Sequence, residues 1–221
     1  MQKELLAVSL PFWKNLNDLQ QKDVIKNTQI IHYKKGQTLP FHDQECIGIM
    51  AIIKGRIRVY ITSSEGREVT LYRMEDKDVC VLSASCVLQS IDFDVCIDAE
   101  EDCEILLLSS ITYAKLMEEN IYVELFSYKT VSERFSDVMW AMQEILFKSF
   151  DKRLATFLLE ESMRNKTNTL AITHEQIARL LGSAREVVSR MLKYFVKEGY
   201  LTLSRGTISI LDKDGLEALL K

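Results

Sequence analysis

Features that would mark a membrane protein or a secreted protein are missing from this sequence. No apolar run approaches the roughly 20 residues that a membrane-spanning helix needs, and residues 1–5 lack the apolar core of a signal peptide. These absences predict a cytoplasmic protein with no membrane partner. In that compartment cysteines are expected to be thiols rather than disulfides, and the chain has five of them: Cys46, Cys80, Cys86, Cys96 and Cys103.

The sequence also lacks the short motifs with which common enzymes hold phosphates, dinucleotides or metals. It contains no P-loop, no G-x-G-x-x-G, no C-x-x-C pair and no obvious nucleophile–base set. Only three histidines are present, which is few for a metal enzyme. We therefore expect no catalytic residue and no metal ligand. An enzyme that acts on a small molecule and uses its helical segment for protein contact is kept as an alternative.

Charge is distributed unevenly along the 221 residues, which are 47% hydrophobic and 27% charged, as in a soluble globular protein. The whole chain has a net charge of −4, yet residues 150–221 carry 12 basic and 9 acidic side chains, a net charge of +3. Residues 1–149 carry 16 and 23, a net charge of −7. The acidic first part is unsuited to DNA, so nucleic-acid contacts are expected in the last part.

A helix-turn-helix is predicted in the basic part of the chain. Thr173 and Gln176 are spaced as a capping box at the start of the first helix, and Gly182 is expected to end it. Ser183 and Glu186 are spaced as a second capping box, which is expected to open the second helix. Apolar and polar side chains separate onto opposite faces of this second helix; the polar face comprises Arg185, Glu186, Ser189, Arg190 and Lys193.

Two short segments of alternating polarity follow, residues 200–203 and 207–210, and they predict a β-hairpin with Arg205 at its tip. From Arg164 to Arg205 there are eight Lys or Arg side chains and three Glu, a local net charge of +5. A helix-turn-helix with a hairpin wing and this charge is typical of a DNA-binding domain. The alternative is a helical hairpin with an ordinary solvated face; the agreement of caps, turn, wing and charge favours the first interpretation.

Strand patterns dominate from residue 28 to residue 108, after a short helix that Asn17 is expected to cap. Short alternating or apolar runs, among them residues 56–61, 68–72 and 104–108, are separated by turn signals, which is typical of a sandwich or barrel. The compact apolar segment 79–88 is expected to be a short helix or a loop.

A helical pattern returns near Thr112 and continues to Phe147. From Val131 to Ile145 apolar residues recur with strict 4-3-4-3 spacing, which favours a seam with a second helix over packing against the chain's own domain. A further helix is predicted over residues 151–162. The predicted seam comprises Ile121, Tyr128, Val131, Phe135, Val138, Met142 and Ile145.

A β-rich first half, a long central helix and a C-terminal winged helix-turn-helix resemble the CRP/FNR family of bacterial transcription regulators. Residues 185–190 are similar to the family's recognition helix, in which a Glu and an Arg one turn apart read bases; Glu186 and Arg190 stand at these positions. The resemblance implies an α+β fold in three parts. These are a jelly-roll-like β-roll sensor (a double-stranded β-helix) at residues 1–111, a central dimerisation helix at 112–147 and the winged helix-turn-helix at 148–221.

The same resemblance implies several partners. They are double-stranded DNA, a second copy of the chain, RNA polymerase and a small-molecule effector that the sequence does not identify. Because the family's members are homodimers, an inverted-repeat site with a TGA-like core is expected. The side chains expected to contact DNA are Thr173, Ser183, Arg185, Glu186, Ser189, Arg190, Lys193 and Arg205.

The predicted effector pocket departs from the family's cyclic-nucleotide branch. In that branch a Gly-Glu pair holds the ribose and a later Arg-Ser pair holds the phosphate. No Arg or Lys lies between Asp78 and Lys115 in this chain, so a cyclic nucleotide's phosphate would lack its charge-assisted partner. We expect an effector that is hydrophobic or neutral rather than cyclic AMP. The pocket is expected to be formed by Val81, Leu82, Cys86, Phe93 and Asp94.

The iron–sulfur branch of the family is not matched either, because no cysteine precedes Cys46. The other four cysteines lie in the predicted pocket segment without C-x-x-C spacing, and free cysteine is commonly a small buried hydrophobe. The sequence therefore requires no cofactor. A thiol- or haem-based redox sensor, with haem or a metal held by cysteines or by His42, is kept as the alternative.

Overall fold

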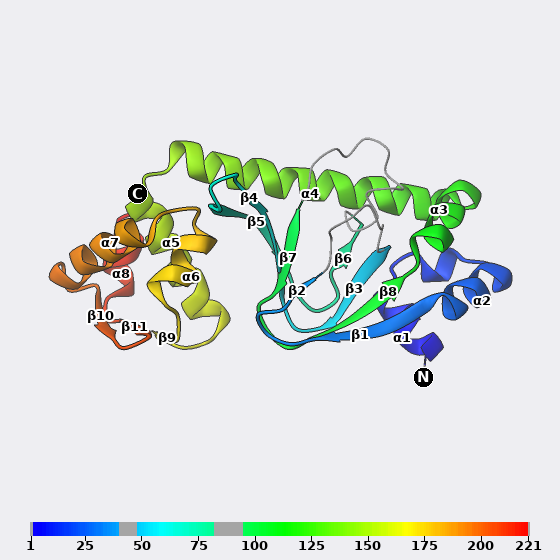
Figure 1. Cartoon of the computed structure of the whole chain (residues 1–221), viewed down its shortest axis with the longest axis horizontal. Helices are drawn as coiled ribbons and strands as arrows, with labels where there is room; N and C mark the ends of the chain where they lie inside the picture. Colours follow the sequence, from blue (N-terminus) through cyan, green and yellow to red (C-terminus); the bar gives the residue numbers. More distant parts are fainter. Residues whose placement is uncertain (1, 40–47, 82–94, 221) are drawn as a thin grey trace. The chain divides into compact units, whose positions relative to one another are not determined.

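The computed structural model describes residues 2–39, 48–81 and 95–220. Contacts divide the chain into two compact units, Met1–Ile61 with Leu71–Met139, and Thr62–Thr70 with Trp140–Lys221. The first unit contains most of the strands and the second contains the basic helical segment (Figure 1). None of the helices within the described ranges is both long enough and apolar enough to cross a lipid bilayer.

Three helical segments precede the strands: α1 (Gln2–Ser9), η1 (Trp13–Asn15) and α2 (Asp18–Lys26). The cap predicted at Asn17 is confirmed, since its side chain accepts a hydrogen bond from the Gln20 amide at 2.9 Å and its own amide donates to Gln20 Oε1 at 3.2 Å. Helix α1 was not predicted; it is anchored by Leu6 and Leu10, both fully buried.

The strands form two four-stranded antiparallel sheets, with orders β1-β8-β3-β6 and β2-β7-β4-β5. Strand β8 is central to the first sheet and pairs with β1 from Thr28↔Leu108 to Tyr33↔Cys103. The β-roll that the family resemblance implied is thereby confirmed. The strands are β1 (Thr28–Tyr33), β2 (Thr38–Leu39), β3 (Ile49–Lys54), β4 (Ile57–Thr62), β5 (Glu68–Met74), β6 (Val79–Cys80), β7 (Cys96–Ala99) and β8 (Cys103–Leu108).

Two apolar clusters hold this unit together. One is shared by the sheets and includes Ile52 of the first and Val59 of the second, which are buried with Ile97 and Ile105. The other packs the N-terminal helices, through Leu6 and other residues, against strands β3 and β8. Burial of apolar surface at roughly 25 cal/mol per Å2 is the dominant favourable contribution to such a fold.

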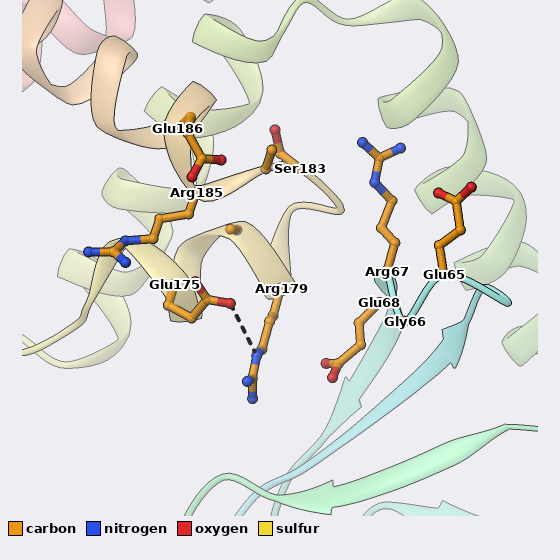
Figure 2. Close-up of a pocket in the computed structure, with 11 residues that line it drawn as sticks. Glu65, Gly66, Arg67, Glu68, Glu175, Arg179, Ser183, Arg185 and Glu186 are labelled. Atoms are coloured by element: carbon orange, nitrogen blue, oxygen red, sulfur yellow. Dashed lines mark ion pairs between the residues drawn. The ribbon is translucent and has the colours of Figure 1, made fainter.

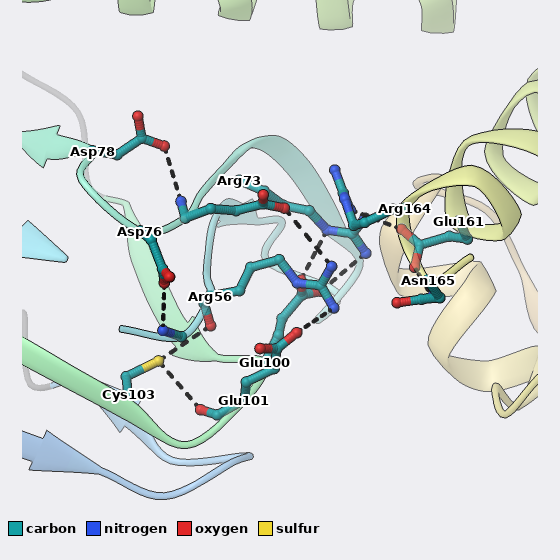
Figure 3. Close-up of polar contacts among 12 residues, drawn as sticks. Arg56, Arg73, Asp76, Asp78, Glu100, Glu101, Cys103, Glu161, Arg164 and Asn165 are labelled. Carbon is teal, nitrogen blue, oxygen red and sulfur yellow. Dashed lines mark hydrogen bonds and ion pairs between the residues drawn. The ribbon is translucent and has the colours of Figure 1, made fainter. Parts of the chain in front are cut away.

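The β-roll contains a largely buried ionic cluster, in which Arg56 and Arg73 converge on Glu100 (Figure 3). Arg56 Nε lies 3.0 Å from Glu100 Oε2, and Arg73 Nε lies 2.9 Å from the same oxygen. The neighbouring Gly55 has φ +98°, and a Cβ there would lie 2.6 Å from the Asp102 carbonyl oxygen. This turn therefore requires glycine, because a side chain would be strained and would collide with backbone.

The helical region predicted from residue 112 to residue 147 consists of two helices, α3 (Ser110–Glu119) and α4 (Ile121–Phe147). Asn120 interrupts them in an extended conformation, with φ −138° and ψ 105°. Its side-chain amide donates to the Asn15 carbonyl oxygen and to Gln20 Oε1, both at 3.0 Å. A long-range polar contact therefore sets this break, and its partners lie about 100 residues away in the sequence.

The second unit is a winged helix-turn-helix, as predicted. A three-stranded antiparallel sheet, in the order β10-β11-β9, packs with the helices around a core that includes Leu154, Val188, Phe195 and Leu216. Strand β9 and helix α8 were not predicted. The elements are α5 (Phe150–Arg164), β9 (Thr169–Leu170), α6 (His174–Leu180), α7 (Arg185–Lys197), β10 (Leu201–Ser204), β11 (Thr207–Ile210) and α8 (Lys213–Ala218).

Candidate DNA-binding interface

The first helix of the predicted motif, α6, has the two ends that the sequence indicated. The Gln176 amide donates to Thr173 Oγ1 at 3.2 Å and the Thr173 amide donates to Gln176 Oε1 at 2.8 Å, so the capping box is confirmed. At the other end Gly182 has φ +59°, and the Ser183 amide donates to the Ala178 carbonyl oxygen at 2.9 Å. This is the Schellman arrangement, which ends a helix and turns the chain sharply.

The second capping box, predicted for Ser183 and Glu186, does not form. Ala184 is the N-cap of α7, it carries no side-chain capping bond, and the helix begins at Arg185. Ser183 is instead part of the turn, because its backbone amide donates a hydrogen bond to the Ala178 carbonyl oxygen. Glu186 therefore stands in the first turn, where its negative charge interacts favourably with the helix dipole. Its side chain is not used for capping, so capping does not compete with a DNA contact.

Helix α7 has one buried face and one exposed polar face. Val188, Leu192 and Phe195 are fully buried in the core of the second unit. These three residues recur at 4-3 spacing and define the face of α7 that packs on the core, with Met191 partly buried beside them. The exposed side chains include four that the sequence predicted as DNA contacts: Arg185, Glu186, Arg190 and Lys193.

The positive charges on this face are available to a ligand. Within the parts of the chain that the structure describes, no carboxylate forms an ion pair with Arg185, Arg190, Lys193 or the wing's Arg205. On α6, by contrast, Arg179 Nε lies 3.8 Å from Glu175 Oε1 (Figure 2). Since α7 leaves several cations without an internal partner, the face can bind an anionic polymer without first breaking ion pairs.

Ser189 is the one predicted contact residue of α7 that is half-buried rather than exposed. Its Oγ lies 2.8 Å from Nδ1 of His174, at the start of α6. Burial, followed by the charges of Arg185 and Lys193, lowers the pKa of His174. No sequence signal pointed to this pair, because the two residues are 15 apart and lie on different helices.

The wing lies at the edge of the same unit. Strands β10 and β11 pair from Leu201↔Ile210 to Ser204↔Thr207, which leaves Arg205 and Gly206 as a two-residue turn. Gly206 has φ +74°, a conformation that glycine adopts at no steric cost, and Arg205 is exposed. Thr173, another predicted contact, is exposed, and its hydroxyl is already bonded to Gln176 within the α6 cap.

The residues predicted as a dimer seam differ in their exposure along α4. Tyr128 and Phe135 are exposed by 58% and 65%, and Ile121, Met142 and Ile145 are exposed as well. Val131 and Val138 instead pack against the core of the chain's own β-roll. The predicted seam therefore combines exposed residues with two valines that contact the chain's own β-roll.

Little of the predicted effector pocket can be placed. Leu82, Cys86, Phe93 and Asp94 lie outside the described residues, as do His42 and Cys46. Val81 is fully buried in the cluster that packs the N-terminal helices against the sheet. Among the other cysteines, Cys80 and Cys103 are buried and Cys96 is half-buried.

Backbone carbonyl groups accept hydrogen bonds from the Cys103 thiol. Its Sγ donates to the carbonyl oxygens of Glu101 at 3.2 Å and Arg56 at 3.3 Å. Burial raises the pKa of this thiol, which disfavours the reactive thiolate at neutral pH.

A β-roll, a long helix and a winged helix-turn-helix with an exposed cationic face define a DNA-binding regulator. Residues 30–120 match the cyclic nucleotide-binding domain, and residues 152–219 match the Crp-like helix-turn-helix domain. The transcriptional activator protein FnrA of Stutzerimonas stutzeri is 25% identical over 227 residues, covering 97% of this chain and 89% of that protein. The cyclic AMP receptor protein of Thermus thermophilus is 23% identical over 187 residues, covering 85% and 86%.

Similarity to a solved structure is higher. A protein from Eubacterium rectale, assigned to the CRP/FNR family of transcriptional regulators, is 46% identical and superposes with a TM-score of 0.91, covering 96% of this chain and 98% of that one. The chain belongs to the CRP/FNR family of transcription regulators. Its two matched domains are those of a cyclic-nucleotide-binding-type sensor fold and a DNA-binding helix-turn-helix.

Proposed function

We propose that this protein is a sequence-specific transcription regulator, not an enzyme, that binds an inverted repeat in double-stranded DNA as a homodimer. The observation that carries the proposal is the exposed, unpaired cationic face of α7, opposite a face that is fully buried. A helix held in this way by its own core can enter the major groove without unfolding any part of the domain.

The base contacts are assigned to the first two turns of α7. An arginine fork can donate to O6 and N7 of guanine, and a carboxylate can accept from N4 of cytosine. Arg190 and Glu186, one turn apart, are therefore suited to neighbouring G·C pairs, with Arg185 and Ser189 beside them. Lys193 and Arg205 are assigned to phosphates, and Thr173 and Ser183 to phosphate contacts through groups at the start and end of α6.

The dimer seam is assigned to an exposed apolar stripe on α4. Its members recur at 4-3 spacing along the full helix, with one serine among them, as in a two-helix seam. The residues that the sequence predicted and that fit this stripe are Ile121, Tyr128, Phe135 and Met142. The complete stripe is Ile121, Leu125, Tyr128, Ser132, Phe135, Met139, Met142 and Leu146.

The three parts of the chain then have separate tasks. Residues 1–111 would sense the effector, residues 112–147 would join the two copies, and residues 148–221 would bind DNA and present the complex to RNA polymerase. A two-fold dimer places its recognition helices about 34 Å apart, one turn of B-DNA, which requires half-sites at that spacing.

The effector is proposed to be something other than cyclic AMP. Residues 79–114 contain no Arg or Lys, so a buried phosphate would have no charge-assisted partner from this segment. A hydrophobic or neutral effector fits better. The thiol alternative is weakened by Cys80 and Cys103, which are buried, because a redox-sensing thiol has to be accessible as a thiolate.

The test is selection of binding sites from a pool of duplexes with a randomised central segment, followed by footprinting on the enriched sequence. An inverted repeat with a discrete footprint, and an affinity that falls steeply with salt, is the expected result. Enrichment of no motif would contradict the proposed sequence-specific DNA binding. A motif without two-fold symmetry would contradict the proposed homodimer.

A further inference from the structure

The 2.8 Å contact between His174 Nδ1 and Ser189 Oγ crosses from the first helix of the motif to the second. Ser189 lies between Glu186 and Arg190 on α7, so its hydroxyl stands among the proposed base-reading side chains. A serine hydroxyl has one proton to donate and can accept through its lone pairs. If the imidazole accepts the hydroxyl proton, the oxygen lone pairs are left for the DNA. If the imidazole donates to the oxygen, the hydroxyl proton is left for the DNA.

The charged groups around His174 are two cations on α7 and one carboxylate, Glu175, which lines the same groove. Helix α7 brings Arg185 and Lys193, whose charges lower its pKa together with burial. On its own helix Glu175 is paired with Arg179. The wing adds Ser204, Gly206 and Thr207, none of which titrates, and these residues line a groove of about 280 Å3 together with His174 and Arg185.

We propose that His174 is a specificity-determining positioning residue, which sets the hydrogen-bonding polarity of Ser189 and thereby the base that Ser189 reads. This inference rests on the proposed function, in which α7 reads bases. It concerns a contact within the protein, so it can fail while the recognition helix is correctly assigned.

The proton balance is simple. In the neutral imidazole with its proton on Nε2, the Nδ1 lone pair accepts the Ser189 hydroxyl proton. The lone pairs of Oγ then face the DNA, and Ser189 accepts from an amino group, such as N4 of cytosine or N6 of adenine. When the imidazole takes up a proton from solvent, Nδ1–H donates to Oγ instead. The Ser189 O–H, which stays intact, then points toward the DNA and donates a hydrogen bond to O6 or N7 of guanine or to O4 of thymine.

The two states therefore prefer different bases at one position of each half-site. Above the pKa of His174 an amino-bearing base edge is favoured, and below it a carbonyl-bearing edge. DNA phosphates brought near the imidazole favour its protonated form, so the change is expected within the range in which histidine ordinarily titrates. Preferences at the positions read by Glu186 and Arg190 are expected to stay the same.

The experiment is site selection from the randomised duplex pool with the whole 221-residue chain at about pH 6 and about pH 8. For the wild type, one base position per half-site should change its preference between the two conditions. His174→Asn can hold Ser189 through an amide that does not titrate, so its preferences should be the same at both pH values. Ser189→Ala should lose the preference at that position altogether.

Affinity for the duplex enriched at about pH 8, measured by fluorescence anisotropy, supplies a second readout. His174→Ala should weaken binding about ten-fold, the order of one good base contact, in the wild-type background. It should have little effect in the Ser189→Ala background, because its action runs through Ser189. Thermal melting of each variant shows that the fold is retained, and His174→Asn serves if His174→Ala unfolds.

Three results would overturn the inference. They are unchanged wild-type preferences at the two pH values, a pH-dependent change that survives in His174→Asn, and an equal effect of His174→Ala in both backgrounds, which would make His174 a direct DNA contact. If the wild type enriches no motif, the proposed function fails. If it enriches a motif that pH does not alter, only the role of His174 fails.

Discussion

Nη1 of Arg153, on α5, donates a hydrogen bond at 2.8 Å to the backbone carbonyl oxygen of Leu181. Leu181 is the C-cap of α6, where carbonyl groups have no partner within the helix. The bond therefore ties the turn of the helix-turn-helix to the helix that precedes the motif. The geometry between α6 and α7 depends on a side chain about 30 residues earlier in the chain.

Replacing Arg153 with Met should lower the free energy of unfolding of the second unit by about 1–3 kcal/mol, because the Leu181 carbonyl loses its partner. Lys152→Met is the matched control, since it removes the same charge from the neighbouring position without removing this bond. Urea unfolding followed by circular dichroism gives the difference. Equal stability of the two variants would show that the Arg153 bond contributes nothing measurable.

Arg190 and Lys193 lie on the same exposed face, and we expect their replacement to affect DNA binding differently. Arg190→Ala should lose about 1–3 kcal/mol on the selected site and relax the preference at one base pair, because a base edge loses its fork. Lys193→Ala should weaken all sequences alike and reduce the salt slope by about one unit. Parallel site selection and salt titration distinguish the loss of a base contact from the loss of a phosphate contact. If Arg190→Ala enriches the same motif as the wild type, Arg190 does not read a base and the recognition helix must be reassigned.

If the exposed apolar stripe of α4 is the dimer seam, a charged residue introduced in the middle of the stripe should give a folded monomer. Phe135 is 65% exposed in the single chain, so Phe135→Glu should leave the fold intact. It would bury two like charges in the dimer, at a cost of several kcal/mol. Analytical ultracentrifugation should show monomer, and DNA affinity should fall because the half-sites are no longer coupled. Val138→Glu is the comparison: it should lower Tm, because Val138 packs against the β-roll core. A dimeric Phe135→Glu would place the seam on another surface.

Acid should destabilise the second unit through His174. Its pKa is lowered in the folded protein, so the unfolded chain takes up the proton first as the pH falls below the ordinary value of about 6.5. Stability is therefore fully present above that value and is lost until the folded protein is protonated too. His174→Asn should remove this part of the pH dependence, as urea unfolding between about pH 8 and about pH 5 would reveal. Parallel curves for the two proteins would contradict the assignment.

Cyclic AMP should neither bind nor change the affinity for DNA, because no Arg or Lys in residues 79–114 can pair with its phosphate. Isothermal calorimetry on the protein measures binding directly, and a gel shift with and without the nucleotide measures its effect. Binding in the micromolar range would show that a cation from another segment takes the arginine's place.

Local signals in the sequence were sufficient where the controlling contacts are local. The boxes at Asn17 and Thr173 each join a cap to the residue three places on, and Gly182 ends α6 by its own conformational freedom. The Ser183 box has the same spacing and does not form. In the turn after Gly182 the Ser183 amide donates a hydrogen bond to the Ala178 carbonyl oxygen, so the helix begins two residues after Ser183.

Spacing alone could not decide which partner a face meets. Val131 and Phe135 fit one heptad pattern, yet the first packs on the β-roll and the second is exposed. Residues of both kinds recur every three or four positions, and the pattern carries no information about what lies opposite.

The sequence by itself determined the order of the main elements, the polar face of the second motif helix and the basic character of the DNA-binding part, because these follow from residue type and short-range spacing. Only the tertiary structure decided that His174 bonds Ser189, that Arg153 holds the turn at Leu181 and that Asn120 divides the helical region. Each of these is a hydrogen bond between residues far apart in sequence. Such bonds form only after the apolar faces have packed and brought their donors and acceptors within reach.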